Sequence, residues 1–181
     1  MSENPENGVP AVKTPPVLKK RSFQSWKRML AIPVVAIVGF LIIWCVFLFL
    51  YQGRMIYFPR DYEKGYQEIM PAEMVELDYE MSAGEQRAFY LPPENGGQPE
   101  AVWVHFSGNA SLALDWLDVV DPQPDPSAGH LLLDYPGYVF NEGTTNPSSI
   151  KESSEAALEA LADELGMEMG ELEERLNVIG F

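Results

Sequence analysis

Two turns in the second half of the chain hold residue types that could bind a reacting carbonyl oxygen. The first is Ser107–Gly108–Asn109–Ala110, which follows the apolar run AVWVHF. Small residues let the backbone turn sharply, so that an N–H group can point at a substrate oxygen just before a helix starts. The same residues also suit a simple strand-to-helix turn with a helix cap. The residue types therefore indicate either an oxyanion-binding turn or a structural cap.

The second turn follows the run HLLLD and reads DYPGYVFNEGTTNP. Both turns come directly after apolar runs, and α/β proteins place their sites at the carboxyl ends of such strands. A serine nucleophile would need a base within hydrogen-bond reach, and neither His105 nor His130 comes with a serine on a strained turn. We do not expect His105 and Ser107 to form such a pair, because Ser107 lies in the turn.

Composition excludes several classes of function. The 181 residues include twelve Lys plus Arg and 27 Asp plus Glu, and this net charge of −15 argues against a nucleic-acid partner. One cysteine cannot form an internal disulfide, and two histidines cannot build a Cys/His zinc cluster. We expect no metal and no other cofactor. Residues 52–181 hold six basic and 25 acidic side chains, a net charge of −19, which suits a soluble acidic domain or adaptation to a salty medium.

An apolar block separates an anchor from the folded part of the chain. Met29 to Leu50 is a run of 22 residues without a charge, and a helix needs about 20 apolar residues to cross a bilayer. A cleaved signal peptide has a shorter apolar core and a small-residue cleavage site, whereas bulky Trp44 and Tyr51 occupy the exit end here. We therefore predict an uncleaved signal anchor, a single transmembrane helix over residues 29–51.

The charges on either side of the anchor predict its orientation. Only Arg54 and Arg60 follow it within ten residues, whereas six basic residues precede it: Lys13, Lys19, Lys20, Arg21, Lys27 and Arg28. Because cytoplasmic flanks carry an excess of Lys and Arg, we expect a cytoplasmic N-terminus and a folded domain on the non-cytoplasmic side. Residues 1–28, which are rich in proline and have little apolar periodicity, are predicted to be a disordered basic tail.

Aromatic residues cluster just after the anchor, in the stretch YQGRMIYFPRDYEKGY. Tyr51, Tyr57, Phe58 and Tyr62 have two possible environments. They could lie at the level of the lipid headgroups, where aromatic rings are enriched, or pack under the folded domain.

The folded part alternates strands and helices. Residues 73–80 and 86–91 alternate or cluster apolar residues around Ser82–Ala83–Gly84, which predicts a hairpin. Three further runs are short, continuous and apolar, as in strands buried on both faces of a parallel sheet. These are residues 101–106, 130–134 and 176–181.

Helices are predicted between these buried strands, which requires right-handed crossovers. Residues 112–120 show helical spacing at Leu112, Trp116, Val119 and Val120. The second helix has Asn146 as its N-cap, Pro147 at its first position and Gly166 at its end. Its apolar stripe consists of Ile150, Ala157, Leu158, Leu161 and Leu165. A buried strand at the last residues would leave the sheet uncovered, so we expect residues 52–181 to be an incomplete α/β domain.

Together these blocks resemble the α/β-hydrolase family, in particular its membrane-anchored Bem46/ABHD13-like branch. The resemblance covers residues 51–181 in the right order and implies the N-terminal part of a mostly parallel sheet with crossover helices. The blocks that carry it are YQGRMIYFPR, VWVHFSGNASLALDWL, LLLDYPGY, NEGTTNPS and LNVIGF.

The resemblance assigns roles to the two turns. In that family the first turn carries an H-G-N-A type motif, and the backbone N–H at its asparagine position forms half of the oxyanion hole. Gly108, Asn109 and Ala110 match, with Ser107 where histidine is common. The family's second pattern is D-Y-x-G-Y-G-x-S-x-G, and this sequence departs from it at Val139 and Phe140. Val139 in place of glycine would be strained at positive φ.

The resemblance also bears on the catalytic residues. The family's acid comes much later in the chain, so Asp134 is expected to bond loop backbone instead. A nucleophile elbow, G-x-S-x-G, follows the strand that LNVIGF resembles, which makes Gly180 and Phe181 its first two residues. The nucleophile would come directly after Phe181, and no catalytic residue is expected within the 181.

Two functions from different classes fit these residues. The first is the N-terminal portion of a membrane-anchored serine hydrolase, acting on an ester, thioester or amide through an acyl-enzyme. It would be inactive as this fragment and would take a small acyl substrate when extended. The second is a non-catalytic membrane-anchored binding domain or pseudoenzyme. Whether the reading frame continues past Phe181 distinguishes them.

Overall fold

The computed structural model describes residues 23–120 and 125–180. The chain divides into two compact units, Met1–Phe49 and Leu50–Phe181, and each is described by itself.

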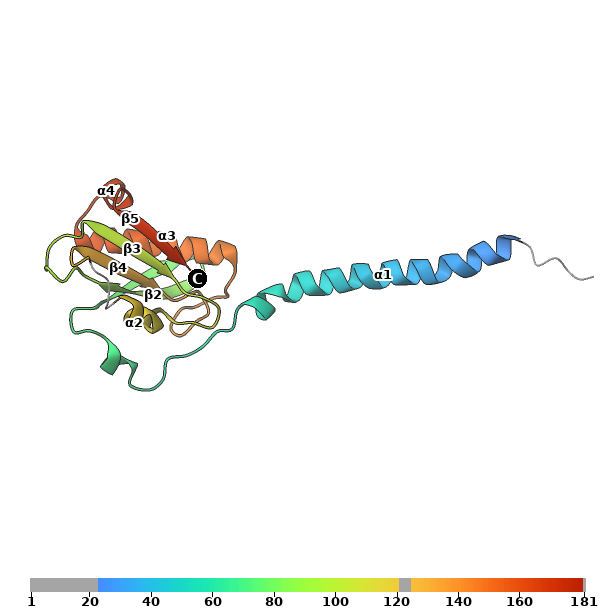
Figure 1. The fold of residues 1–181 in the computed structure, drawn as a ribbon, viewed down its shortest axis with the longest axis horizontal. Helices are drawn as coiled ribbons and strands as arrows, with labels where there is room; N and C mark the ends of the chain where they lie inside the picture. The colour runs from blue at the N-terminus through green and yellow to red at the C-terminus, as the bar shows by residue number, and fades with distance from the viewer. Residues whose placement is uncertain (1–22, 121–124, 181) are drawn as a thin grey trace, which may run out of the picture. The chain divides into compact units, whose positions relative to one another are not determined.

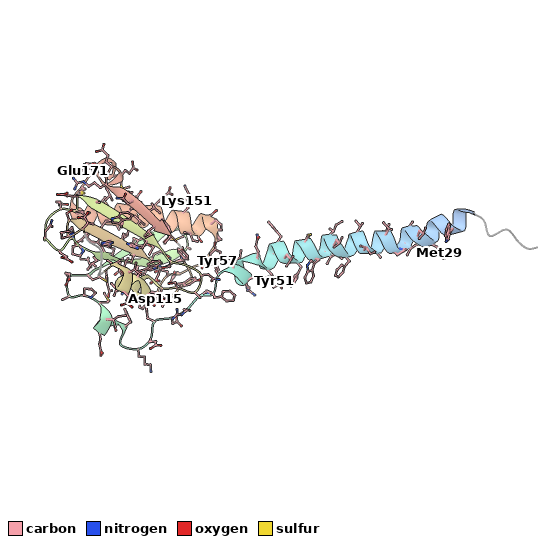
Figure 2. All side chains as sticks on the ribbon, viewed as in Figure 1. Met29, Tyr51, Tyr57, Asp115, Lys151 and Glu171 are labelled. Carbon is pink, nitrogen blue, oxygen red and sulfur yellow. The ribbon has the colours of Figure 1, made fainter. Side chains whose placement is uncertain are left out.

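The first helix, α1, spans Phe23–Ile56. Its part from Met29 to Ile56 has a mean hydropathy of 2.9 and is long and apolar enough to cross a membrane. Apolar side chains project along its length and are exposed, as Figure 2 shows between the labelled Met29 and Tyr51. The predicted anchor lies inside this helix. Of the predicted tail, residues 1–22 lie outside the described residues, and Phe23 onward is helical.

The second unit is built on a mixed five-stranded sheet in the order β1-β2-β4-β3-β5. Figure 1 labels β2, β3, β4 and β5 of this sheet. The strands are β1 (Val75–Met81), β2 (Gly84–Leu91), β3 (Ala101–Phe106), β4 (Ala128–Leu133) and β5 (Leu176–Gly180). The pairs β1–β2 and β2–β4 are antiparallel, whereas β4–β3 and β3–β5 are parallel. The predicted hairpin and the predicted parallel strands are therefore confirmed, and the fold class is α/β.

Helix α3 (Pro147–Leu165) covers one face of this sheet (Figure 1). The side chain of Asn146 accepts hydrogen bonds from the N–H groups of Ser148 and Ser149, and Gly166 ends the helix at φ 62°. Both predicted signals are confirmed. From the stripe, Ala157 and Leu161 are fully buried. They pack with the short helix α4 (Met169–Glu173) on apolar residues of β2, β3 and β4.

The other face carries shorter elements. A 3₁₀ turn, η2 (Ala113–Trp116), leads into a single helical turn, α2 (Leu117–Val120). The prediction of one α-helix over 112–120 is wrong at its start, because the first turn is 3₁₀. Of its predicted apolar positions, Trp116 and Val120 are buried, whereas Val119 is exposed. A second 3₁₀ turn, η1 (Tyr66–Ile69), lies before β1. Burial on both faces explains why every residue of β4 is buried, as its apolar run predicted.

Strand β5 lies at the edge of the sheet and pairs with β3 among the described residues. Its burial differs from the prediction of a buried strand. Val178 is 67% exposed, and Leu176 and Ile179 are half-buried, because β5 lies at the end of the strand order. This leaves an apolar, pairing-competent edge.

Candidate functional site

The carboxyl ends of β3, β4 and β5 lie side by side. Phe106, the last residue of β3, is in register with Leu133 of β4 on one side and with Gly180 of β5 on the other. The turn Ser107–Ala110 therefore begins beside Gly180. Phe181, the second residue of the predicted elbow, lies outside the described residues.

The start of this turn is fixed by buried hydrogen bonds. Ser107 is buried, and its hydroxyl donates to the carbonyl of Leu133 at 3.3 Å. The hydroxyl of Tyr135 donates to the carbonyl of Ser107 at 2.5 Å. Ser107 therefore serves the backbone of the turn, and it is not paired with His105.

The oxyanion candidates form a tight turn with one strained residue. The N–H of Ser111 donates to the carbonyl of Gly108 at 3.2 Å, and Ala110 between them has φ 59°. This left-handed value at the third position is typical of a type II turn, which favours glycine there. The N–H of Asn109 makes no hydrogen bond to any described residue, and Asn109 is exposed. The turn thus presents a backbone donor, without an acceptor among the described residues, at the carboxyl ends of the strands.

A segment from just after α1 lies across this turn. We call residues Tyr57–Tyr62 the strap. The N–H of Phe58 donates to Oδ1 of Asn109 at 3.2 Å. The guanidinium of Arg60 donates to the carbonyl of Ala110 at 2.7 Å and lies 3.4 Å from the carboxylate of Asp115. Figure 2 labels Tyr57, at the start of the strap, and Asp115, on η2.

Two of the four aromatic residues whose environment was left open, Tyr57 and Tyr62, pack against the folded domain. Tyr57 packs edge-to-face on Tyr135, and Tyr62 stacks on Tyr66 with a centroid separation of 4.8 Å. In contrast, Tyr51 and Phe58 are exposed. The sequence carried no signal for the bonds of the strap to the turn, because their partners are about fifty positions apart in the chain.

A buried carboxylate joins the strap to the end of β4 and the start of η2. Asp134 follows β4 and is 3% exposed. It accepts from the N–H of Ala113 at 2.8 Å and from the hydroxyl of Tyr62 at 2.6 Å, and the N–H of Leu114 donates to that hydroxyl at 3.2 Å. Burial raises the pKa of Asp134 to about 6, although these two hydrogen bonds favour the ionised form. The expectation that Asp134 bonds loop backbone is confirmed.

The second turn holds the other strained residue of the candidate site. Val139 has φ 49°, a left-handed value that confirms the expected strain. Its N–H donates to the carbonyl of Arg60 at 3.3 Å. Asn141 is buried and binds the loop to the sheet: it accepts from the N–H of Arg87 at 2.7 Å and donates to the carbonyl of Asp134 at 2.7 Å.

The two histidines contact each other inside the sheet. Nε2 of His105 lies 3.0 Å from Nδ1 of His130, and both rings are buried. Burial, and then the nearby His130, lower the pKa of His105 to about 4. Burial likewise lowers the pKa of His130, so both rings favour the neutral form, in which one ring donates to the other across this contact. Within the described part of the chain, no group of three or more His, Cys, Asp or Glu side chains could hold a metal.

One cavity bordered by the described residues lies away from the turn. It has a volume of about 630 Å³ and is bordered by Leu91, where β2 ends, and by Ala128 and His130, where β4 begins. Because β2 and β4 are antiparallel, the cavity lies at the end of the strands opposite to the one that holds Gly108 and Gly180. Carboxylates at Glu73, Glu94, Asp118 and Asp125 also line it.

No protein-family model matches this chain, and no curated protein sequence matches it. Solved structures do match, at low identity. A lidless α/β serine hydrolase from Xanthomonas campestris is 11% identical, with a TM-score of 0.42, over 62% of this chain and 52% of that one. A hypothetical protein from Pseudomonas aeruginosa is 15% identical, with a TM-score of 0.43, over 68% of this chain and 40% of that one.

A third match is a CE1 ferulic acid esterase from Anaeromyces mucronatus, solved with ferulic acid. It is 15% identical, with a TM-score of 0.29, over 67% of this chain and 52% of that one. The chain thus spans about half, or less, of the length of these solved structures.

Proposed function

We propose that residues 52–181 are the N-terminal portion of a membrane-anchored serine hydrolase, of the branch of the α/β-hydrolase family that the sequence resembles. It hydrolyses an ester, thioester or amide through an acyl-enzyme, and its nucleophile follows Phe181. The chain of 181 residues is then inactive by itself, since none of its described residues pairs a nucleophile with a base.

The observation that carries this proposal is the register of Phe106 with Gly180. It puts the turn after β3 next to Gly180 at the end of β5, and the N–H of Asn109 in that turn has no acceptor among the described residues. An acyl-transfer site needs this juxtaposition. A nucleophile on one strand end attacks the carbonyl carbon, while a backbone N–H from the adjacent turn stabilises the oxyanion.

The proposed reaction follows from that geometry. The catalytic base takes the proton of the serine hydroxyl as the serine oxygen forms a bond to the carbonyl carbon. The carbonyl π bond opens, and the carbonyl oxygen takes up the negative charge opposite the N–H of Asn109. When the carbonyl re-forms, the alcohol, thiol or amine leaves with a proton from the catalytic base, which gives the acyl-enzyme. Water then gives a proton to the base and attacks the same carbon. The bond from that carbon to the serine oxygen breaks, the serine takes the proton from the base, and the acid is released.

The anchor and its orientation belong to the same proposal. The helix between Met29 and Ile56 is long and apolar enough to span a membrane. The basic flank of residues 13–28 supports a cytoplasmic N-terminus, which leaves the hydrolase domain on the non-cytoplasmic side.

The test is activity-based labelling of two proteins in detergent micelles. One is the chain of 181 residues, and the other continues through the downstream reading frame. A fluorophosphonate should label the extended protein at the residue after Phe181, heat-denatured extended protein should not be labelled, and the shorter chain should stay unlabelled. A stop codon directly after Phe181, or an extended protein that resists labelling, would instead support a non-catalytic binding domain.

A further inference from the structure

Arg60 of the strap is bonded to both strained positions of the candidate site. Among the described residues, Ala110 and Val139 are the only non-glycine residues with positive φ, at 59° and 49°. The guanidinium of Arg60 donates to the carbonyl of Ala110 at 2.7 Å, and the carbonyl of Arg60 accepts from the N–H of Val139 at 3.3 Å. One residue therefore holds the two strained residues, one in each turn.

Strain of this kind needs support from its surroundings. A left-handed conformation costs a residue with a Cβ atom free energy that glycine does not pay, and it persists only where neighbouring contacts over-determine it. At Ala110 and the preceding Asn109 the strap supplies two such contacts. Arg60 binds its carbonyl, and the N–H of Phe58 binds the side chain of the preceding Asn109.

The charge of Arg60 is also held in place. Its guanidinium lies 3.4 Å from Oδ2 of Asp115, and the same oxygen accepts from the N–H of Leu112 at 2.9 Å, where η2 begins. Ala110 at the end of the turn and Leu112 at the start of η2 are thus connected through Arg60 and Asp115. Half of the Arg60 side chain is exposed, so these contacts stabilise the fold as a whole only modestly.

We propose that Arg60 is a positioning residue for the oxyanion turn. By holding Ala110 in its left-handed conformation, it sets the direction of the N–H of Asn109 toward the reacting carbonyl. Arg60 does not touch the substrate. This role rests on the proposed hydrolase function. It also makes the geometry of the catalytic turn depend on a segment that begins directly after α1 ends at Ile56.

The first test uses the full 181-residue chain in detergent micelles and needs no activity. Hydrogen exchange is followed by mass spectrometry on peptides that cover residues 107–114. Arg60→Gln should speed exchange of these amides roughly three- to tenfold, because one partly exposed hydrogen bond to the turn is lost. Arg60→Lys should restore part of the protection. The matched control is Lys64→Gln, which removes the same charge four residues further on, from a position outside these contacts.

The second test uses the extended protein and a soluble ester. Arg60→Gln should lower kcat about tenfold with little change in KM, as expected when a transition-state donor is misdirected. Ala110→Gly should reduce that loss, because glycine adopts the left-handed conformation without support. The coupling between positions 60 and 110 is the signature of positioning, which a purely structural contribution to folding would not produce.

The outcomes separate this inference from the function on which it rests. If wild-type extended protein is not labelled by the fluorophosphonate, the proposed function fails. If it is labelled, any of three results overturns the inference. Hydrogen exchange of residues 107–114 could be unaltered in Arg60→Gln, or it could change equally in Lys64→Gln. The third result is an effect of Arg60→Gln on kcat that is the same in the Ala110→Gly background.

Discussion

The hydroxyl of Tyr62 donates a 2.6 Å hydrogen bond to Asp134, a carboxylate that is 3% exposed and lies 72 positions later in the chain. The N–H of Ala113 donates to the other oxygen of the same carboxylate. The strap, the end of β4 and the start of η2 therefore meet at one buried charge. Because burial opposes ionisation of this carboxyl, the junction should respond to pH.

Replacing Asp134 with Asn should change how stability depends on pH. The pKa of Asp134 is about 6 in the folded chain against an ordinary value of 3.8. Between these values the folded state holds a proton that the unfolded state has released, so Asp134 makes stability fall as pH rises from about 4 to 6. In Asp134→Asn this contribution, about 3 kcal/mol by the pKa difference, should disappear. Denaturant midpoints between pH 4 and 7 measure it.

His105 provides the opposing control. Its folded pKa of about 4 lies below the ordinary 6.5, so the unfolded state binds the extra proton and stability rises with pH across this window. As pH rises from 4 to 6, the free energy of unfolding of Asp134→Asn should therefore increase more than that of the wild type, whereas that of His105→Gln should increase less. Parallel curves for all three proteins would contradict the assignment of these pKa shifts.

Val139→Gly should raise the free energy of unfolding, although glycine is usually a destabilising replacement. At φ 49° a β-branched side chain is strained, and glycine removes that cost, for a net gain of roughly 0.5–1 kcal/mol. The control is Val119→Gly in α2, where helical backbone makes the same replacement destabilising by about 1 kcal/mol. A loss of stability in Val139→Gly would show that the surroundings of Val139 outweigh its backbone strain.

Local signals in the sequence were sufficient for much of the fold. Asn146, Pro147 and Gly166 each act within one helical turn, so their chemistry alone marks the ends of α3. The run at residues 101–106 matches β3 residue for residue, because a strand buried on both faces needs continuous apolar side chains. Gly108 to Ala110 could be assigned to a turn for the same local reason.

The contacts that hold the candidate site could not be predicted in this way. Arg60 and Ala110 are fifty positions apart, and neither has a neighbour in sequence that indicates the other. The start of the predicted helix at 112–120 was wrong for a related reason. The N–H groups of Ala113 and Leu114 bond to Asp134 and Tyr62, partners from distant segments, and the first turn is 3₁₀. Periodicity carries no information about such partners.

A topology reporter should detect the proposed orientation of the anchor. A reporter active only outside the cytoplasm should work when fused after Phe181 and fail when fused after Arg28. The reason is the excess of Lys and Arg before Met29. Flanks that are rich in these residues are retained in the cytoplasm. A matched pair of reporters that are active only in the cytoplasm should show the opposite pattern. If the cytoplasmic reporter works after Phe181, the orientation is inverted.

The exposed edge at β5 should make residues 52–181 prone to association. Val178 is 67% exposed on a strand that pairs with β3 on one side, so an apolar edge is open to another strand. Residues 52–181 expressed alone should bind a hydrophobic dye and sediment as oligomers, and Val178→Glu should reduce both. Val119→Glu, at another exposed valine, is the control. A monomeric wild-type fragment with a cooperative unfolding transition would rule out this edge as a source of association.

In the extended protein, Gly108→Val and Asn109→Ala should differ in their effects on turnover. Valine at 108 places a branched side chain in the turn that Gly108 closes with Ser111, which misdirects the N–H of Asn109. Loss of one oxyanion donor costs roughly 10²- to 10³-fold in kcat. Asn109→Ala keeps that N–H and removes only the acceptor for the N–H of Phe58, 3.2 Å away, so its cost should be smaller. Steady-state kinetics on a soluble ester, with fluorophosphonate labelling as a check on the nucleophile, compare the two. If Asn109→Ala abolishes turnover while Gly108→Val leaves it unchanged, the backbone is not the donor, and the turn is a structural cap.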